Sequence, residues 1–457
     1  MTALVIHGHF YQPPRENPWT GEVETEPSAA PFHDWNERIH AECYAPNVDN
    51  YPLISFNFGP TLLSWLAEHH ADTYQKILAA DKISAEARGG HGNAIAQAYG
   101  HAILPLCNER DRLTQVVWGL ADFRFRFGRD AEALWLPETA ANDEVLSLLI
   151  EQGMRYVILA PAQAKGNIDS SKPYVFRHVD GSGRSLAVFF YNGPLARAIA
   201  FEGALSSSRG LVERFVSAAR LGDLVNVATD GETYGHHFKF GDLGLAHALR
   251  AEAKAAGFWI TNYAQYLDHH PPELTVEIDN GPDGEGSSWS CVHGVARWAR
   301  DCGCHTGGEP DWNQKWRQPL RAAFEFLRDD AAVKFEDAAS GLLRDPWEAR
   351  NDYISVVLDP DARESFLDRH SLRGAEDVLK LMEMQRSALL MFTSCGWFFS
   401  DLAGIETVQV MRYAARVIDL MDQLGLDPPR QRFLEILSEA KSNRPEKGNG
   451  ADIFSRI

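Results

Sequence analysis

Residues 227–237 read Val-Ala-Thr-Asp-Gly-Glu-Thr-Tyr-Gly-His-His and bring acidic, aromatic and imidazole side chains together in one short stretch. The lead-in from Leu224 to Val227 is mostly apolar, and the chain then turns abruptly polar. This change predicts a buried strand that ends where its residues meet solvent. Two carboxylates, a tyrosine and two histidines at one strand end are more than folding requires. The alternative is a helix start that is capped by Asp230 and carries Glu232 in its first turn.

Other apolar segments end in the same way. The strand Leu4–Ile6 leads into two histidines that share one face, and Trp135-Leu-Pro leads directly into Glu138. Amphipathic helices are predicted between the strands. Alternating strands and helices predict a parallel α/β fold, and polar groups after several strands favour a barrel over an open sheet. The chain contains neither a Gly-x-Gly-x-x-Gly after its first strand nor a Walker pattern, so a nucleotide cofactor has no support and no cofactor is expected.

The character of the chain changes after about residue 280. We therefore expect a catalytic barrel over residues 1–280 and a mainly helical region over 281–457 that completes the active-site cleft. The hydrophobic spacing in the second part predicts helices over 314–328, 375–391, 406–424 and 429–442, with a frayed polar tail over 443–449.

Composition limits the classes of partner. The 457 residues carry a net charge of −19 with no basic tract, which argues against nucleic acid and anionic membrane surfaces. Neither a membrane-spanning apolar run nor a signal peptide is recognised, so a cytoplasmic protein is expected. The six cysteines are then expected to be thiols. The oligomeric state is not predicted.

Glu138 and Asp230 are the two carboxylic acids of most interest, because each follows a different predicted strand. Two such acids facing one another across a cleft are the minimum equipment of a glycosidase. One acid protonates the leaving oxygen while the other attacks the sugar or positions water. The pair alone is not specific, since the chain has 63 acidic residues.

Four motifs in one order add specificity. They are His7-Gly-His-Phe-Tyr-Gln-Pro13, Gly100-His-Ala-Ile-Leu-Pro-Leu106, Trp135-Leu-Pro-Glu138 and Asp230-Gly-Glu-Thr-Tyr-Gly-His236. With them the chain resembles glycoside hydrolase family 57, the α-amylase and α-glucan-acting enzymes built on an incomplete (β/α)7 barrel. The resemblance covers about residues 1–300.

The resemblance implies a retaining mechanism on α-linked glucan or oligosaccharide, by hydrolysis or by transglycosylation. Glu138 matches the nucleophile and Asp230 the general acid/base, with carboxyl groups about 5–5.5 Å apart. The expected substrate-binding residues on the same likeness, together with a later aromatic block, are His7, His9, Gln12, His101, Trp135, His236, Trp289, His293, Arg297 and Trp298. Glu232 is expected either to support the site from behind or to hold His7 or His9.

The chain departs from the family pattern after residue 286. There it reads Ser287-Ser-Trp-Ser-Cys-Val-His-Gly-Val-Ala-Arg-Trp298 and continues into Cys302-Gly-Cys-His305. These residues resemble a little-characterised branch of the family, which leaves the substrate open. Cys291, His293, Cys302, Cys304 and His305 offer enough ligands for zinc. However, Cys-x-Cys is not the common zinc spacing, so buried thiols are favoured and no metal is predicted.

Two other functions remain open at this point. One is a metal-dependent carbohydrate deacetylase or α-mannosidase on a related barrel, with His7, His9 and Asp230 as ligands. The other is a catalytically silent carbohydrate-binding protein, against which the presence of both acids argues.

Overall fold

The computed structural model describes residues 1–457, which divide into two compact units. The barrel unit comprises Met1–Gln12, Glu24–Ala98 and Phe123–Ser290. The helical unit comprises Pro13–Val23, Tyr99–Asp122 and Cys291–Ile457. The last change from the barrel unit to the helical unit falls after Ser290, ten residues later than the expected boundary at residue 280. Two earlier segments, Pro13–Val23 and Tyr99–Asp122, also belong to the helical unit. None of the helices combines the length and apolar character that crossing a membrane requires.

Strand β1 (Ala3–Phe10) is the centre of the barrel unit, and every one of its residues is buried. It lies parallel to β2 (Ser55–Phe58) on one side and β8 (Leu224–Asp230) on the other. The short strand β9 (Trp259–Ile260) pairs with the start of β1. A strand buried on both sides reads as a continuous apolar run, so the polar residues at its far end stand out in the sequence.

The remaining parallel strands continue the series. Strand β3 (Ala96–Gln97) pairs with β4 (Leu134–Trp135), and β5 (Tyr156–Leu159) pairs with β7 (Ser185–Phe190). Single parallel bridges, Phe56 to Ala94 and Ala133 to Tyr156, join these pairs to β2 and to one another. The amide of Asn192 donates to the carbonyl of Asn226 over 2.8 Å, which ties the end of β7 to β8. Seven parallel strands therefore follow one another, as the α/β barrel prediction requires.

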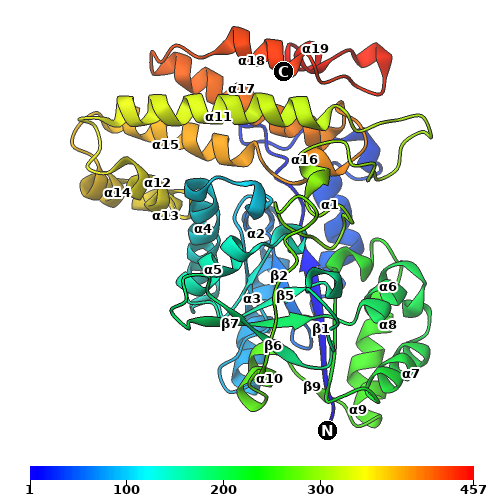
Figure 1. Cartoon of the computed structure of the whole chain (residues 1–457). Coiled ribbons are helices and arrows are strands. Elements are labelled where there is room, and N and C mark those ends of the chain that lie inside the picture. Colours follow the sequence, from blue (N-terminus) through cyan, green and yellow to red (C-terminus); the bar gives the residue numbers. More distant parts are fainter. The chain divides into compact units, whose positions relative to one another are not determined.

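Two further strands extend this unit. Strand β6 (Pro173–Arg177) runs antiparallel to β7, and β10 (Leu274–Thr275) runs parallel to β6. Helices alternate with the strands (Figure 1). They are α1 (Trp35–Ile39), α2 (Pro60–His69), α3 (Ala71–Ala87), α5 (Asp143–Glu151), α6 (Gly193–Phe201), α7 (Ser208–Ala218), α8 (Gly241–His247), α9 (Ala253–Ala255) and α10 (Tyr263–His269). Side chains of Asn142, Asn192 and Asn262 accept hydrogen bonds from the first turns of α5, α6 and α10, as N-caps do.

The helical unit is built on three long helices, α11 (Arg317–Ala339), α15 (Ala375–Leu390) and α17 (Ile405–Gln423), which pack against one another (Figure 1). Shorter ones are α12 (Pro346–Asp352), α13 (Ile354–Leu358), α14 (Arg363–His370), α16 (Cys395–Phe398), α18 (Arg430–Leu437) and α19 (Gly450–Phe454). Helix α4 (Glu109–Phe127) begins in this unit and ends in the barrel unit.

Three expectations for the helical part were wrong. The helix predicted over 429–442 covers only Arg430–Leu437. The helix predicted over 314–328 begins at Arg317, so that Pro319 falls in its first turn, where a proline is tolerated. It continues to Ala339 through a charged stretch that hides its apolar spacing. The tail over 443–449 is not frayed, because the side chain of Asn443 donates to two backbone carbonyls and Asn449 caps α19.

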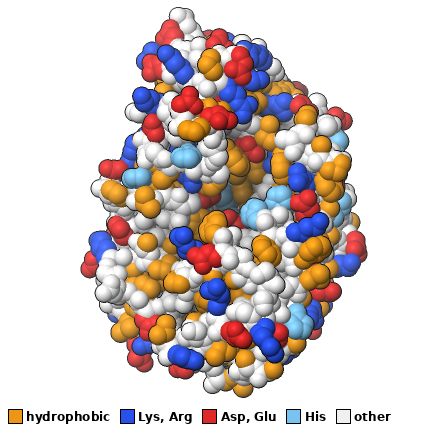
Figure 2. All heavy atoms as spheres, turned by 90° about the vertical axis from the view of Figure 1, so that its right-hand side faces the viewer, with side chains coloured by type: hydrophobic (Ala, Val, Ile, Leu, Met, Phe, Trp, Pro, Cys, Tyr) orange, Lys and Arg blue, Asp and Glu red, His pale blue; other side chains and the backbone are white.

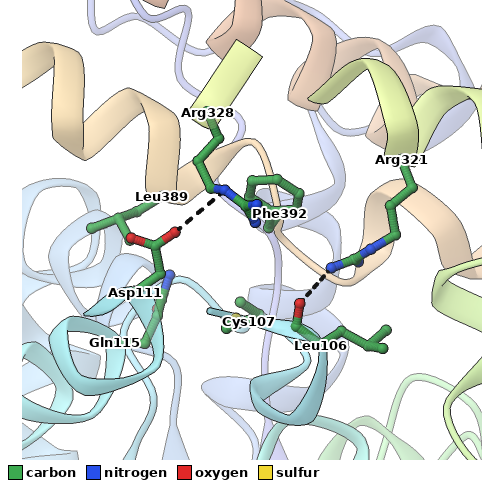
Figure 3. A pocket seen from close by; sticks show the side chains of 9 residues that line it. Leu106, Cys107, Asp111, Gln115, Arg321, Arg328, Leu389 and Phe392 are labelled. Carbon is green, nitrogen blue, oxygen red and sulfur yellow. Dashed lines mark hydrogen bonds and ion pairs between the residues drawn. The ribbon is translucent and has the colours of Figure 1, made fainter. Parts of the chain in front are cut away.

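A small pocket in the helical unit shows how its polar groups are satisfied (Figure 3). Arg321 donates to the carbonyl of Leu106 over 2.7 Å, and Arg328 lies 3.9 Å from the carboxylate of Asp111. Asp111 also accepts from buried Arg350 over 2.7 Å. On the face that Figure 2 displays, acidic and basic side chains are interspersed.

Candidate active site

The register of β1 brings the polar strand ends of the barrel unit together. His9 is level with Asp230 of β8 on one side and with Asn57 of β2 on the other. His7 lies two residues earlier, opposite Ser55. Because alternate residues of a strand point to the same face, all of these side chains share one side of the sheet. The cluster that the first and last motifs predicted is therefore a property of strand pairing.

Asn57 holds both histidines. His7 Nε2 lies 3.1 Å from the side-chain oxygen of Asn57, and its Nδ1 lies 2.9 Å from the hydroxyl of Ser55. The amide nitrogen of Asn57 lies 3.0 Å from His9 Nδ1 and donates to Gln97 over 2.7 Å. Since an amide oxygen accepts and an amide nitrogen donates, we assign both histidines as neutral Nε2–H tautomers.

Burial keeps these histidines uncharged. It lowers the pKa of His7 and of His9 to about 3, and the hydrogen bond that each makes with Asn57 opposes this fall without cancelling it. Both ring nitrogens of His7 are engaged by neighbours. A metal ligand needs a free ring nitrogen, so the metal-dependent alternative with His7, His9 and Asp230 as ligands does not fit this arrangement.

Glu232 is buried and does not serve as the holder of His7 or His9. One of its oxygens accepts from the backbone amide of Tyr11 over 3.0 Å and from the hydroxyl of Tyr44 over 2.7 Å. Burial nevertheless raises its pKa to about 7, and these hydrogen bonds only partly oppose that rise. The position of Glu232 agrees with the expectation that it supports the site from behind, because its negative charge raises the pKa of Asp230.

Glu138 occupies a strained turn directly after β4. Its φ is 59° and that of Thr139 is 51°, a left-handed conformation that side-chain-bearing residues rarely adopt. The buried side chain of Gln163 holds the turn, since it accepts from the Thr139 hydroxyl and donates to the Thr139 carbonyl, each over 2.8 Å. Strain of this kind persists only where surrounding contacts enforce it, and it gathers at functional sites.

The carboxylate of Glu138 is oriented by a distant segment. Trp289 donates its indole N–H to Oε2 over 3.1 Å, and the Ser290 hydroxyl donates to the same oxygen over 2.7 Å. The backbone amide of Trp289 also donates to the Glu138 carbonyl over 3.1 Å. Hydrogen bonds to an ionised acceptor are the stronger ones, so these donors favour a charged, fixed carboxylate.

Asp230 has different surroundings from Glu138. Asp230 keeps exposed surface at the end of β8, while neighbouring protein atoms desolvate its carboxyl group. This desolvation raises its pKa well above the usual range, and the negative charges of Glu232 and then Glu138 raise it further. A neighbouring carboxylate opposes ionisation because two like charges would share one site. Burial and these two charges therefore favour the protonated form of Asp230.

Aromatic rings line the same region. Trp135 stacks on His7 and His9 with ring centroids 4.8 and 4.9 Å away, and Trp289 meets Trp135 edge-on at 5.2 Å. Tyr191 lies edge-on to Trp289 at 6.3 Å. Trp135 is fully buried and supports the histidines, whereas Trp289 is only half-buried and keeps part of its surface open.

The other expected binding residues lie in different surroundings. Gln12 is half-buried and donates to the carbonyl of Tyr11, while His236 forms a short hydrogen bond with Glu42. His101 belongs to the helical unit, where its Nδ1 lies 2.6 Å from the hydroxyl of Ser394.

Three more expected residues belong to the helical unit. Trp298 is fully buried, and the Arg297 guanidinium lies over the ring of Phe398 at 3.9 Å. Neither side chain presents a surface to a sugar in this structure. His293 lies beside Cys304.

Several residues of the site escaped sequence reasoning. Asn57 and Gln97 are polar residues inside buried strands, and that misfit was the available signal. Ser290 and Gln163 carried no comparable signal, since a serine in a loop and a glutamine after a strand are common. Only their contacts with the Glu138 turn distinguish them.

The fold and the paired acids place the chain among α/β-barrel proteins of carbohydrate chemistry. The family model described as glycosyl hydrolase family 57 matches residues 32–279, and the model "Domain of unknown function (DUF3536)" matches residues 312–457. The chain belongs to glycosyl hydrolase family 57.

Several known proteins resemble this chain at low sequence identity. The chain is 22% identical over 294 residues to a 4-alpha-glucanotransferase of Thermococcus litoralis, covering 62% of this chain and 41% of that enzyme. The matches to curated relatives span 18% to 41% of their lengths. Among solved structures, an exo-type maltose-forming amylase of Pyrococcus sp. ST04 has a TM-score of 0.72 at 15% identity, covering 96% of this chain and 82% of that chain. A branching enzyme of Pyrococcus horikoshii has a TM-score of 0.63 at 15% identity, covering 97% and 95%. At these identities the structural likeness supports the fold.

Proposed function

We propose that this protein is a retaining glycoside hydrolase or transglycosylase that acts on α-linked glucan or oligosaccharide. The observation that carries the proposal is the position of two acids at the ends of separate parallel strands, Glu138 directly after β4 and Asp230 at the end of β8. Asp230 has its pKa raised partly by the charge of Glu138, while Glu138 accepts two hydrogen bonds that favour its ionised form. Environments that separate the protonation states of two carboxyl groups supply one acid and one nucleophile.

The reaction divides into two steps. In the first, a Glu138 oxygen attacks the anomeric carbon while Asp230 gives its proton to the departing glycosidic oxygen. The product is a sugar ester of Glu138 and a carboxylate at Asp230. In the second step Asp230 takes a proton from water or from a sugar hydroxyl, whose oxygen then displaces Glu138. The incoming group decides between hydrolysis and transfer.

The surroundings of the acids fit this chemistry. The neutral imidazoles of His7 and His9 add no charge beside the two acids, and the open part of Trp289 offers an aromatic surface to a sugar face. The curated relatives, which include two α-amylases and a 4-alpha-glucanotransferase, favour an α-glucan as the first substrate class to test.

The test uses Glu138→Gln and Asp230→Asn against linear and branched α-glucans and short maltooligosaccharides, with product chromatography. Each substitution is expected to lower turnover by at least about 10³-fold, since each removes an atom that reacts. The matched control is Glu151→Gln, which changes an exposed carboxyl group that is hydrogen-bonded to His178. This variant should keep full activity. If both Glu138→Gln and Asp230→Asn turn over substrate as fast as the wild type, the assignment is wrong.

Covalent trapping tests the retaining mechanism separately. An activated fluorosugar should label Glu138 and be located there by peptide mass spectrometry. Azide should restore turnover to a Glu138→Gly variant, with a glycosyl azide of inverted configuration as product. A label on another residue, or direct release of inverted sugar by the wild-type enzyme, would refute the mechanism. The ratio of free sugar to elongated product then measures hydrolysis against transfer.

A further inference from the structure

The segment from Cys291 to Trp316 has almost no regular structure, apart from one turn of 3-10 helix at Ala296–Trp298. Four side chains of this segment nevertheless converge. Cys291, His293, Cys302 and Cys304 each contribute one ligand atom, and these four atoms lie within 4.8 Å of one another. We call them the thiol–imidazole cluster.

The distances within the cluster match those around a tetrahedral zinc ion. Cys291 Sγ lies 3.8 Å from Cys302 Sγ and 3.8 Å from Cys304 Sγ, and Cys304 Sγ lies 3.5 Å from His293 Nδ1. With zinc–sulfur bonds of about 2.3 Å and zinc–nitrogen bonds of about 2.0–2.1 Å, tetrahedral angles separate two sulfurs by about 3.8 Å and a sulfur from a nitrogen by about 3.6 Å. A disulfide would need its sulfur atoms at about 2.05 Å.

The backbone is shaped to present these ligands. Gly303, between Cys302 and Cys304, has φ of 81°, a left-handed conformation that turns the chain so that both neighbouring thiols reach one point. The buried guanidinium of Arg317 donates to the carbonyl of Cys304 over 2.7 Å and fixes that side of the turn. The closely spaced Cys-x-Cys pair, which is unusual for zinc, therefore becomes usable through the geometry of one glycine.

The structure also separates the two histidines of this segment. His293 Nδ1 points at the thiols, whereas His305 Nδ1 lies 3.2 Å from the carbonyl of Gly307 and stands outside the cluster. Three cysteines and one histidine form a closed set of four ligands, which is typical of structural zinc rather than of catalytic zinc with an open position.

We propose that Cys291, His293, Cys302 and Cys304 bind one zinc ion that holds this irregular segment in its fold. The thiols lose their protons on binding, and soft thiolate ligands in a tetrahedral set select zinc over magnesium or calcium. The site replaces the expectation of unpaired buried thiols. It does not depend on the glycosidase proposal, because none of its ligands takes part in that chemistry.

The test measures the metal content of the untagged full-length protein, purified without chelator, by elemental mass spectrometry. One zinc per chain is expected in the wild type. The variants Cys302→Ser, Cys304→Ser and His293→Ala should lose most of it. Two matched controls should keep it, namely His305→Ala and Cys395→Ser, a thiol elsewhere in the helical unit.

A second measurement guards against variants that fail to fold. Wild-type protein stripped with chelator under reducing conditions is titrated with Co²⁺, which should give thiolate-to-cobalt charge-transfer absorption and the visible bands of tetrahedral cobalt. Zinc should abolish both signals. The proposal is overturned if the purified wild type contains no zinc and the stripped wild type gives no tetrahedral cobalt spectrum. A disulfide among the three cysteines would also overturn it. So would a loss of zinc in His305→Ala as large as the loss in His293→Ala.

Discussion

Replacing Glu232 by glutamine should make the barrel unit more stable at alkaline pH. Glu232 is buried, and its pKa is raised from 4.5 to about 7. A raised pKa means that the folded chain holds this proton more tightly than the unfolded chain does. The contribution of Glu232 to stability is therefore fully present below about pH 4.5 and is lost as the pH rises to about 7. At about 1.4 kcal/mol per pKa unit, the loss amounts to about 3 kcal/mol.

Glutamine imitates the protonated acid. Its side-chain oxygen can still accept from the amide of Tyr11 and the hydroxyl of Tyr44, so the two existing hydrogen bonds survive. The wild type and Glu232→Gln should then be of similar stability at pH 5 and differ by about 1–3 kcal/mol in favour of the variant at pH 8. The range allows for the new NH₂ group, which has to find an acceptor of its own.

The assay is denaturant unfolding at a series of pH values from 4.5 to 8.5, followed by tryptophan fluorescence and far-ultraviolet circular dichroism. The matched control is Glu42→Gln, because hydrogen bonds from His236 and Arg38 lower the pKa of Glu42 despite some desolvation. For Glu42 the sign is opposite, so its contribution is lost as the pH falls and its replacement should hurt most at neutral pH. A Glu232→Gln variant that is destabilised equally at every pH would refute the reasoning.

Three further predictions concern other polar groups. Turnover on α-glucan should fall as the pH rises through the raised pKa of Asp230, which gives the kcat/KM profile an alkaline limb. Glu232→Gln should move this alkaline limb to lower pH, because it removes the larger of the two charges that raise the pKa of Asp230. An alkaline limb that does not move would show that it does not report the titration of Asp230. Asn57→Ala should cost about 2–3 kcal/mol in unfolding free energy and lower turnover at least about 10-fold, since His7, His9 and Gln97 lose a shared partner; a variant with wild-type turnover would contradict the positioning role. Asp111→Ala should lower the free energy of unfolding by about 3–5 kcal/mol, because it leaves the buried charge of Arg350 without its carboxylate partner. The control Asp72→Ala breaks the exposed ion pair with Lys76 and should change the melting temperature little.

The sequence by itself determined which strands end in polar side chains. Abrupt changes from apolar to polar residues located the ends of β1, β4 and β8, and hydrophobic spacing located α15 and α17 to within about one residue. These features are local, because a side chain's alternation or helical spacing depends on its near neighbours in the chain. Glu138 and Asp230 could be singled out as candidate acids for the same reason, and their catalytic roles stay a prediction.

Only the tertiary structure decided how these groups are held and charged. The donors to Glu138 lie 151 and 152 residues away, the partner that fixes His7 and His9 lies on another strand, and the ring that joins the cysteine cluster is His293 rather than His305. A pKa depends on burial and on charges that folding brings near, and a hydrogen bond depends on two atoms meeting within about 3 Å. Neither is encoded in spacing along the chain, so the difference between two similar strand-end acids arises only when the barrel assembles.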